Sequence, residues 1–297
     1  MSGSAATVPE GSAALRSESS AVRRRRLGKV LSYGVLIVIA IVYIFPFVIA
    51  VATSFKTDPN ATADPLALRP APFTTSAYHE LFKDDDFLLW IQNSVIVTLS
   101  VTFLRVFLDS LAGYALARLR FRGRGAAFAT IVAVMAVPSV VLLIPKFLMI
   151  RQLGIYNTYY GMIIPLLVDA AGVFIMKNFF ESIPVSVEES ARIDGASIFR
   201  TYWSIVLPMA RPALITIFIL SFQGSWNELA HFIISAQSNS LNTLTKGVAQ
   251  LASGQLGSGN RYPLKLAASV LMTIPVAVLF FVFQRRIMNA SAGAVKE

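Results

Sequence analysis

The sequence predicts an all-α integral membrane protein with six membrane-spanning helices and a cytosolic loop of two short helices. Of its 297 residues, 55% are hydrophobic and only 14% are charged, whereas soluble domains carry roughly a quarter of charged residues. The hydrophobic residues form long runs that approach or exceed the roughly 20 residues a helix needs to cross a bilayer. Basic residues gather at the edges of these runs, as they do in multi-pass membrane proteins.

The first run, 30–55, has no formal charge and follows four consecutive arginines. It is longer than the apolar core of a signal peptide and lacks a small-residue cleavage site, so we interpret it as an uncleaved first span. Five further spans are predicted, at 91–117, 126–145, 159–178, 210–233 and 264–283. The transmembrane domain is therefore expected over 30–284, between a disordered basic tail (1–29) and a short C-terminal tail (285–297).

The distribution of lysine and arginine predicts the orientation. Seventeen of the 26 lie in segments that would share one side with the termini, and eight lie on the other side. Because positive charge accumulates on the cytosolic side, both termini are expected in the cytosol of a bacterial plasma (inner) membrane. The loops 56–90 and 235–263 would then be external.

Several functions are excluded by composition. Without cysteine there is no disulfide and no thiolate metal site, and the two histidines, His79 and His231, are too far apart in sequence to suggest a metal centre. The glycine-rich segment 251–260 lacks the Lys-Ser/Thr pair of a phosphate-binding loop. Ser225 and His231 are poorly spaced for an intramembrane protease, and we expect no enzyme activity in this chain. The net charge of +10 follows the topology and does not indicate nucleic-acid binding.

A charged stretch, 184–208, separates the fourth and fifth predicted spans. Ser186 and Glu189 have the spacing of a capping box, which predicts a helix that starts just after Ser186. Gly195 follows an aspartate and predicts a sharp turn, and Ser197 would cap a second helix. Such a helix pair suits insertion into a groove of another protein, or it is an amphipathic linker on the bilayer surface.

The segment ESARIDGASIFRTYWSIVLP resembles the EAA loop of ABC-importer permeases. In that pattern Glu-Ala-Ala is followed by Gly four residues on and later by Ile-x-Leu-Pro; here nine residues lie between the glycine and the isoleucine. The matching residues are Glu189, Ala191, Gly195, Ile205, Leu207 and Pro208, and Ser190 replaces one alanine. NSVIVTLSVT (93–102), GYALARLRFRGRG (113–125), FQGSWNELA (222–230) and the terminal GAVK resemble the maltose-type permease of carbohydrate importers. The resemblance covers nearly everything from Val30 onward.

The resemblance implies the fold of a type I importer permease that forms half of a heterodimeric pore. It implies a second permease subunit, two ATPase subunits that carry ATP and magnesium, and an extracytoplasmic sugar-binding protein. This chain would bind no cofactor and no metal. The loop 181–208, which we call the coupling loop, would dock into a cleft of one ATPase. The residues predicted to serve this coupling are Glu188, Glu189, Ala191, Asp194, Gly195 and Ala196.

Three charged residues are expected inside the membrane. Arg105 and Asp109 are four residues apart on one face of the second span, which predicts an ion pair, with a role in gating or substrate passage as the alternative. Asp169 would line a polar cavity or cap a broken helix.

Four polar or aromatic residues interrupt the fifth span: Ser225, Trp226, Asn227 and Glu228. Discontinuous helices at this depth build the binding sites of many transporters. Trp226 would offer a flat face to a sugar ring, and Asn227 and Glu228 would bond to hydroxyl groups. The alternatives are an interface anchor for Trp226 and a gate-stabilising partner for Glu228.

The sequence thus predicts a permease subunit of an ATP-driven carbohydrate importer. One alternative keeps this machinery but imports a glycerol phosphate or a polyol; a phosphate would favour a cationic cavity, and the spans offer only Arg105. The other is an ion-coupled secondary transporter or a channel, for which the coupling loop would have no use.

Overall fold

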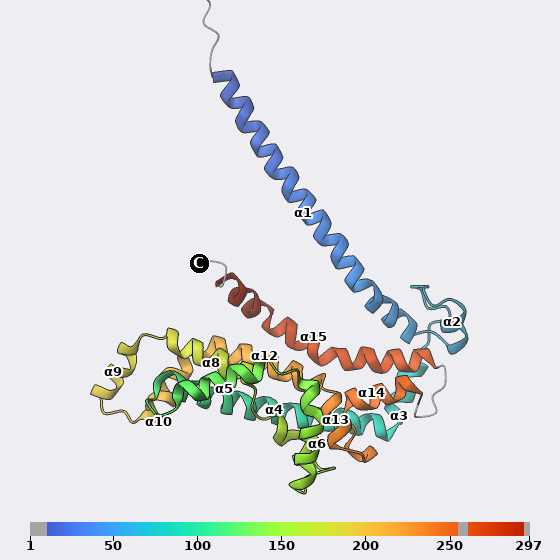
Figure 1. Cartoon of the computed structure of the whole chain (residues 1–297). Coiled ribbons are helices and arrows are strands. Elements are labelled where there is room, and N and C mark those ends of the chain that lie inside the picture. Colours follow the sequence, from blue (N-terminus) through green and yellow to red (C-terminus); the bar gives the residue numbers. More distant parts are fainter. Residues whose placement is uncertain (1–10, 255–260, 294–297) are drawn as a thin grey trace, which may run out of the picture.

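A computed structural model describes residues 11–254 and 261–293, and within these ranges all regular structure is helical (Figure 1). In chain order, the first helices are α1 (Gly11–Ser54), α2 (Asp58–Ala63), α3 (Ser76–Lys83), α4 (Asp85–Arg118), α5 (Arg124–Met135), η1 (Ser139–Leu142), α6 (Leu143–Gln152), α7 (Tyr159–Ile163), η2 (Ile164–Leu166) and α8 (Ala170–Ser182). They are followed by α9 (Val185–Ile193), α10 (Ile198–Thr201), the π-helix η3 (Tyr202–Val206), α11 (Leu207–Met209), α12 (Arg211–Trp226), α13 (Ala230–Ser235), η4 (Asn239–Leu241), α14 (Leu244–Ser253) and α15 (Tyr262–Gly293).

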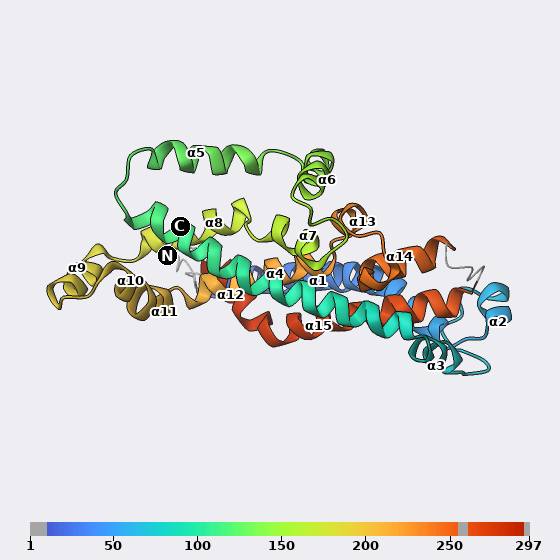
Figure 2. The ribbon, with the colours of Figure 1, turned by 90° about the horizontal axis from the view of Figure 1, so that it is seen from below.

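Helix α4 is the central element, and it packs along both α8 and α12. The α4 and α8 backbones approach closely at Gly113, where a Cβ atom would lie 2.6 Å from the Cβ of Met176. The short helices α9 and α10 lie at one end of the molecule, and α2 and α3 lie at the opposite end (Figures 1 and 2). This separation matches the sequence-based assignment of these segments to opposite sides of the membrane.

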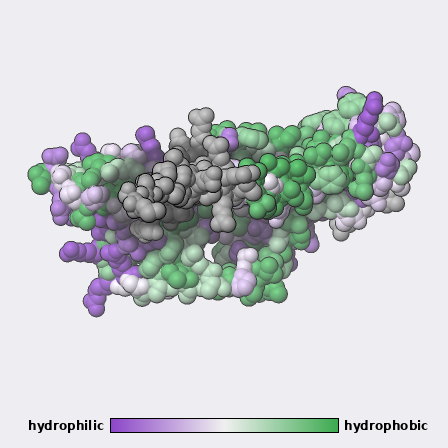
Figure 3. Space-filling view, turned by 90° about the horizontal axis from the view of Figure 1, so that it is seen from above, coloured by the Kyte–Doolittle hydropathy of each residue, from purple (hydrophilic) through white to green (hydrophobic). Residues whose placement is uncertain are grey.

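Three helical segments are long and apolar enough to cross a membrane by themselves: Lys29–Ser54, Asp85–Arg118 and Tyr262–Gln284. They coincide with the first, second and sixth predicted spans. If each of three bent pairs of helices forms one span, the described residues contain as many as six spans. In the space-filling view a broad band of hydrophobic residues lies toward one side of the middle, and hydrophilic residues gather at the two ends (Figure 3).

The other three spans are not the single helices that the sequence predicts. The third breaks between α5 and η1 with a bend of 103°, because Pro138, with ψ 131°, leaves the helical conformation. The fourth bends by 41° between η2 and α8. The fifth ends at Trp226, short of the predicted 233, and α12 forms its bent pair with the helical segment 198–209, at 80°.

Helix α1 projects from the rest and meets α15 near its own C-terminal end (Figure 1). Every side chain from Val30 to Val48 is exposed, so this apolar surface is available to lipid or to a partner. The predicted disordered tail is helical from Gly11 to residue 29, because a helix that already exists extends without a new nucleation cost. Helix α15 likewise continues to Gly293, into the predicted C-terminal tail. Residues 1–10 and 294–297 of the two tails, like 255–260 of the external loop, lie outside the described residues.

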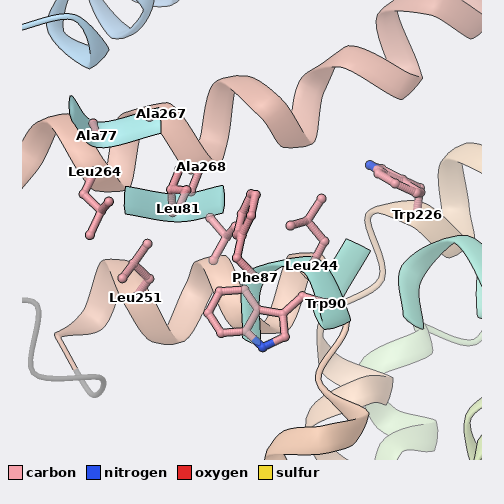
Figure 4. Packing of buried hydrophobic residues seen from close by; sticks show 11 residues of the cluster. Ala77, Leu81, Phe87, Trp90, Trp226, Leu244, Leu251, Leu264, Ala267 and Ala268 are labelled. Carbon is pink, nitrogen blue, oxygen red and sulfur yellow. The ribbon is translucent and has the colours of Figure 1, made fainter. Parts of the chain in front are cut away.

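Three hydrophobic clusters stabilise the described part of the chain, one of them around Met162 and Phe232. Another lies at the end where α3 and α14 meet, around Phe87, Trp90 and Leu244 (Figure 4). Here the ring of Trp90 covers the backbone of α14, and a Cβ at Gly247 would lie 2.2 Å from ring carbons. The third surrounds Tyr202 at the coupling-loop end.

Candidate functional site

The coupling loop begins with α9, which starts earlier than its sequence predicts. The predicted capping box at Ser186 is wrong, because α9 starts at Val185 and Ser186 is its second residue. Pro184 occupies the N-cap with ψ 132° and no side-chain cap bond. A proline fits the start of a helix because its missing N–H would have no intrahelical partner.

The turn between α9 and α10 is the predicted glycine turn. Gly195 has φ +78°, and two backbone bonds close the end of α9. The N–H of Gly195 donates to Arg192 O over 3.0 Å, and that of Ala196 donates to Ala191 O over 2.9 Å. This is the bonding pattern of a Schellman motif. Ser197 then caps α10, as predicted, by accepting from the N–H of Arg200.

Glu188 faces the interior of the protein. Only 2% of this residue is exposed. Its Oε1 lies 2.9 Å from Arg118 Nε in an ion pair whose two atoms lack the alignment of a hydrogen bond. Its Oε2 accepts a long hydrogen bond, 3.4 Å, from the hydroxyl of Tyr114. In this structure Glu188 is therefore not at the surface that a partner would reach, and its part in coupling stays a prediction.

The other coupling residues divide between the interior and the surface. Ala191 is buried, with 3% exposed, so it packs inside the loop. Glu189, Asp194 and Gly195 are exposed, and Ala196 is half-buried. These four stay accessible to a partner, with Glu189 at the surface where an opposite charge can reach it.

Arg118 is a residue of this site that sequence reasoning missed. From the end of α4 its Nη2 donates to the carbonyls of Phe180, over 2.6 Å, and of Ile183. It thereby binds two carbonyls at the end of α8, of which that of Phe180 also accepts from the N–H of Ile183 over 3.2 Å. With Glu188 on its Nε side, it joins α4, α8 and α9. In sequence it is one of four closely spaced arginines, all of which also serve as topology residues, so no pattern distinguished it.

The second helix of the loop is attached to the same face of α4. The hydroxyl of Tyr202, which is buried, lies 2.7 Å from Ser110 Oγ. Its ring packs on Tyr114 with 5.0 Å between centroids. Ser110, Tyr114 and Arg118 are spaced by four residues and therefore share one face of α4. Both helices of the coupling loop thus rest on one side of one span.

Large apolar side chains are exposed on the coupling loop. Ile193 is 86% exposed, and Phe199 and Trp203 stack on each other with 6.3 Å between centroids. We call Ile193, Ile198, Phe199 and Trp203 the tip face. Exposed apolar patches of this kind mark contact surfaces for other proteins or for membranes.

The charged residues within the second span do not pair with each other. Arg105 Nε donates to the carbonyl of Leu166 over 2.7 Å, and Asp109 Oδ1 accepts from the N–H of Asp169 over 3.1 Å. No ion pair joins Arg105 to Asp109 in the described part of the chain, so that prediction is wrong. Both side chains instead bond to backbone groups at the break in the fourth span. Asp169 caps the broken helix, one of its two predicted roles, by accepting from the N–H of Gly172.

The expected sugar-stacking role of Trp226 is not compatible with its position in this structure. The residue is 3% exposed, its Nε1 donates to Met272 O over 3.0 Å, and its ring lies parallel to Phe222 at 5.7 Å. Ser225 is also buried, with Oγ 3.5 Å from Thr98 Oγ1.

Two of the four residues remain near an accessible surface. Asn227 is exposed and donates to Gln223 O. Glu228 is half-buried, and its Oε1 accepts from the N–H of His231 at the start of α13. The structure thus places Asn227 and Glu228 at the break between α12 and α13 and puts Trp226 and Ser225 in the interior.

The end of the molecule with α2 and α3 holds an ion-pair cluster. Arg261 pairs with Glu80 of α3, which raises the pKa of Arg261 above its usual value through hydrogen bonding, and it also lies 3.8 Å from Asp58. Two hollows adjoin Arg261, one of about 220 Å³ and a wide-open one of about 640 Å³ that Asp58 also lines. No group of histidine and carboxylate side chains suited to a metal occurs within 11–254 and 261–293.

Comparison with known proteins agrees with this geometry. A family model described as "Binding-protein-dependent transport system inner membrane component" matches residues 109–290. The chain is 34% identical to the sulfoquinovosyl glycerol transport system permease protein SmoH of Agrobacterium fabrum, over 91% of this chain and 94% of that protein. It is 32% identical to the polygalacturonan/rhamnogalacturonan transport system permease protein YtcP of Bacillus subtilis, over 92% and 99%. Among solved structures, a chain of a bacterial ABC transporter that imports the acidic polysaccharide alginate superposes with a TM-score of 0.77 and 26% identity, over 89% of this chain and 97% of that one.

Proposed function

The chain belongs to the family of binding-protein-dependent transport system inner membrane components, and on that premise we propose that it is a permease subunit of an ATP-driven carbohydrate importer. Support for a carbohydrate comes from relatives at about one-third identity whose names refer to sugar glycosides and oligosaccharides. A phosphate cargo has less support, because Arg105, the cation of the central span, already binds a backbone carbonyl.

The coupling loop would be the contact with an ATPase subunit, and the arrangement of its side chains is the observation that carries this proposal. The buried pairs Glu188–Arg118 and Tyr202–Ser110 hold its two helices against α4. The same helices leave the tip face and Glu189 exposed at one end of the molecule. A rigid base with an exposed apolar and acidic surface suits insertion into a basic groove.

The partners would be those of a complete importer. A second permease subunit would cover part of the exposed apolar surface of α1 and complete the pore. ATP hydrolysis would take place on two separate ATPase subunits below the coupling loop. A binding protein would deliver substrate to the external end, where α2, α3 and α14 lie. Both termini would then be cytosolic, in keeping with the distribution of lysine and arginine.

The substrate path in this subunit would include Asn227 and Glu228 at the break after α12. Asn227 is exposed there, and Glu228 has one carboxylate oxygen beyond the Oε1 that caps α13. Amide and carboxylate groups bond to sugar hydroxyls. Trp226 would support this segment from the interior.

The test is reconstitution of the chain in liposomes with its cognate partner permease, ATPase and binding protein. Candidate sugars are first ranked by the shift they cause in the melting temperature of the binding protein, and uptake of the best one is then measured. We expect uptake only with ATP and with an ATPase able to hydrolyse it. Uptake that follows an ion gradient without any ATPase would overturn the proposal.

A further inference from the structure

The fourth span is interrupted between its two helical halves. Its first half, Tyr159–Leu166, and its second half, Ala170–Ser182, meet at 41°. At such a break the first half ends in carbonyls and the second half begins with N–H groups that have no partner inside their own helix. In a membrane these groups need partners from the protein, because no water is at hand.

Arg105 and Asp109 of α4 supply those partners, one on each side of the break. Arg105 Nε donates to the carbonyl of Leu166, the last residue of the first half, over 2.7 Å. Asp109 Oδ1 accepts from the N–H of Asp169, just before the second half, over 3.1 Å. The two side chains are one helical turn apart on α4.

The sign of each charge fits the helix end that it meets. A helix carries partial negative charge at its C-terminus and partial positive charge at its N-terminus. Arg105 is therefore the favoured residue at the end of the first half, and Asp109 is favoured at the start of the second. The reverse assignment would set like charges against each other at both ends.

The fit at Asp109 depends on a neighbouring glycine. Asp109 is fully buried, and a Cβ at Gly172 would lie 2.1 Å from its Oδ2. Only the absence of a side chain at 172 lets the carboxylate reach the start of α8. Asp169 caps the same helix by accepting from the N–H of Gly172 over 3.0 Å, so two carboxylates hold this helix start.

The break lies between the coupling loop and the external part of the chain. On one side α8 runs directly into the coupling loop, and Arg118 holds the carbonyls at its end. On the other side the first half packs against α13, where His231 Nε2 lies 3.1 Å from the carbonyl of Met162. Movement of the coupling loop relative to the external half can therefore be taken up at the break, besides by α4 or by α12, which connects the loop to α13.

We propose that Arg105 and Asp109 are positioning residues that clamp the two ends of the broken fourth span and make the break a defined hinge between the coupling loop and the external half of the pore. The role of the break as a hinge rests on the proposed function, whereas the clamp of the two helix ends does not. The competing view is a simple ion pair between the two side chains.

Exchange of the two charges separates these views. An ion pair survives the double substitution Arg105→Asp with Asp109→Arg, because both charges are still present. The clamp does not, because a cation then faces the start of α8 and an anion faces the carbonyl of Leu166. Asp109→Asn is the matched control, since its amide oxygen can still accept from the N–H of Asp169, whereas Asp109→Leu removes the acceptor.

The measurements use the assembled transporter in nanodiscs. Because the chain has no cysteine, Tyr160→Cys on α7 and Asn178→Cys on α8, both exposed, place one spin label on each side of the break. The distance between the labels is measured by pulsed EPR without nucleotide and with ATP trapped, and ATP hydrolysis is measured on the same samples.

In the wild type we expect a narrow distribution of the distance between the labels, which shifts when ATP is trapped. The rate of ATP hydrolysis by Asp109→Asn should stay within about threefold of the wild-type rate. Asp109→Leu and the charge exchange should broaden the distribution and lower hydrolysis about tenfold or more, in line with a lost charge–dipole contact and an unsatisfied buried N–H. Restoration of wild-type behaviour by the charge exchange would overturn the clamp.

Two further outcomes are assigned in advance. If Asp109→Leu does not assemble, Gly172→Ala tests the same contact with every charge in place, and wild-type behaviour of that variant would contradict the clamp. If the wild-type complex does not hydrolyse ATP and the distance between its two spin labels does not change, the proposed function and the hinge fail. A narrow distribution of that distance in the wild type that broadens in Asp109→Leu would still support the clamp.

Discussion

Arg118 Nε lies 2.9 Å from Glu188 Oε1, so the last residue of α4 is joined to the first helix of the coupling loop by a buried ion pair. Both side chains are at most 9% exposed. Loss of one member of a buried pair leaves the other charge without a partner, which costs more than the loss of the attraction alone. The pair therefore fixes where the loop sits on the spans.

Truncation of Glu188 should destabilise the chain, whereas truncation of the neighbouring Glu189 should weaken ATPase binding instead. We expect Glu188→Ala to lower the free energy of unfolding by about 3–5 kcal/mol, because it leaves Arg118 buried and unpaired. Glu189→Ala should change it by less than about 0.5 kcal/mol, because Glu189 is exposed, yet it should weaken binding of the ATPase subunit. Thermal unfolding of the purified chain in detergent and ATPase pull-down measure the two effects. Equal loss of stability in both variants would contradict the assignment.

The division of labour between these two residues was not predictable from the sequence. Adjacent residues of a helix point about 100° apart, and the sequence does not indicate which one faces the interior. That choice depends on Arg118, seventy residues earlier. The conserved-looking pattern of the EAA loop correctly located the glycine turn, because Gly195 and the Ser197 cap depend on local backbone chemistry alone.

The same contrast applies to the spans. Long apolar runs located α1, α4 and α15, because burial in lipid needs only length and composition. Arg105 and Asp109 had the spacing of an ion pair, but their partners are backbone groups at a break in another span. Pro138 is present in the sequence as a residue that can end a helix. The bend of 103° between the helices on either side of it is set by tertiary packing.

Gly195 should tolerate asparagine better than alanine. Its φ of +78° lies in the left-handed region, and nothing lies within 4 Å of a Cβ placed there. A substitution therefore acts through backbone strain and not through a clash. We expect Gly195→Ala to cost about 1–2 kcal/mol and Gly195→Asn clearly less, because asparagine enters this region more readily. Ser190→Ala, at an exposed position of α9, serves as the control. Equal thermal stability of the alanine and asparagine variants would show that the turn is not the determinant.

The tip face should determine affinity for the ATPase subunit without contributing to folding. Aromatic side chains in the centre of an interface commonly contribute more than about 1–2 kcal/mol, so Phe199→Ala and Trp203→Ala should each weaken binding about tenfold. Their effect on thermal unfolding should be small, because both rings are exposed.

Tyr202→Phe is the matched control for these variants. It removes the buried hydroxyl that bonds to Ser110, which should destabilise the chain by about 1 kcal/mol, and it leaves the tip face intact. Binding is measured by surface plasmon resonance with the chain in nanodiscs. A tip-face variant with wild-type affinity would place the ATPase contact elsewhere on the loop.

The contact between Trp90 and Gly247 should be the most sensitive point of the cluster around Phe87, Trp90 and Leu244. A Cβ at 247 would lie 2.2 Å from the carbons of the Trp90 ring, and that ring is held among Phe87 and Leu244, so it cannot move aside without loss of packing. We expect Gly247→Ala to destabilise the chain by about 1–3 kcal/mol, as overpacking does. Gly125→Ala in α5 is the control, because nothing lies within 4 Å of its Cβ position and alanine favours the helix. If Gly247→Ala matched Gly125→Ala in thermal unfolding, the close approach of α14 to Trp90 would be disproved. The double variant Trp90→Ala with Gly247→Ala provides the final check: once the ring is gone, alanine at 247 should cost no further stability.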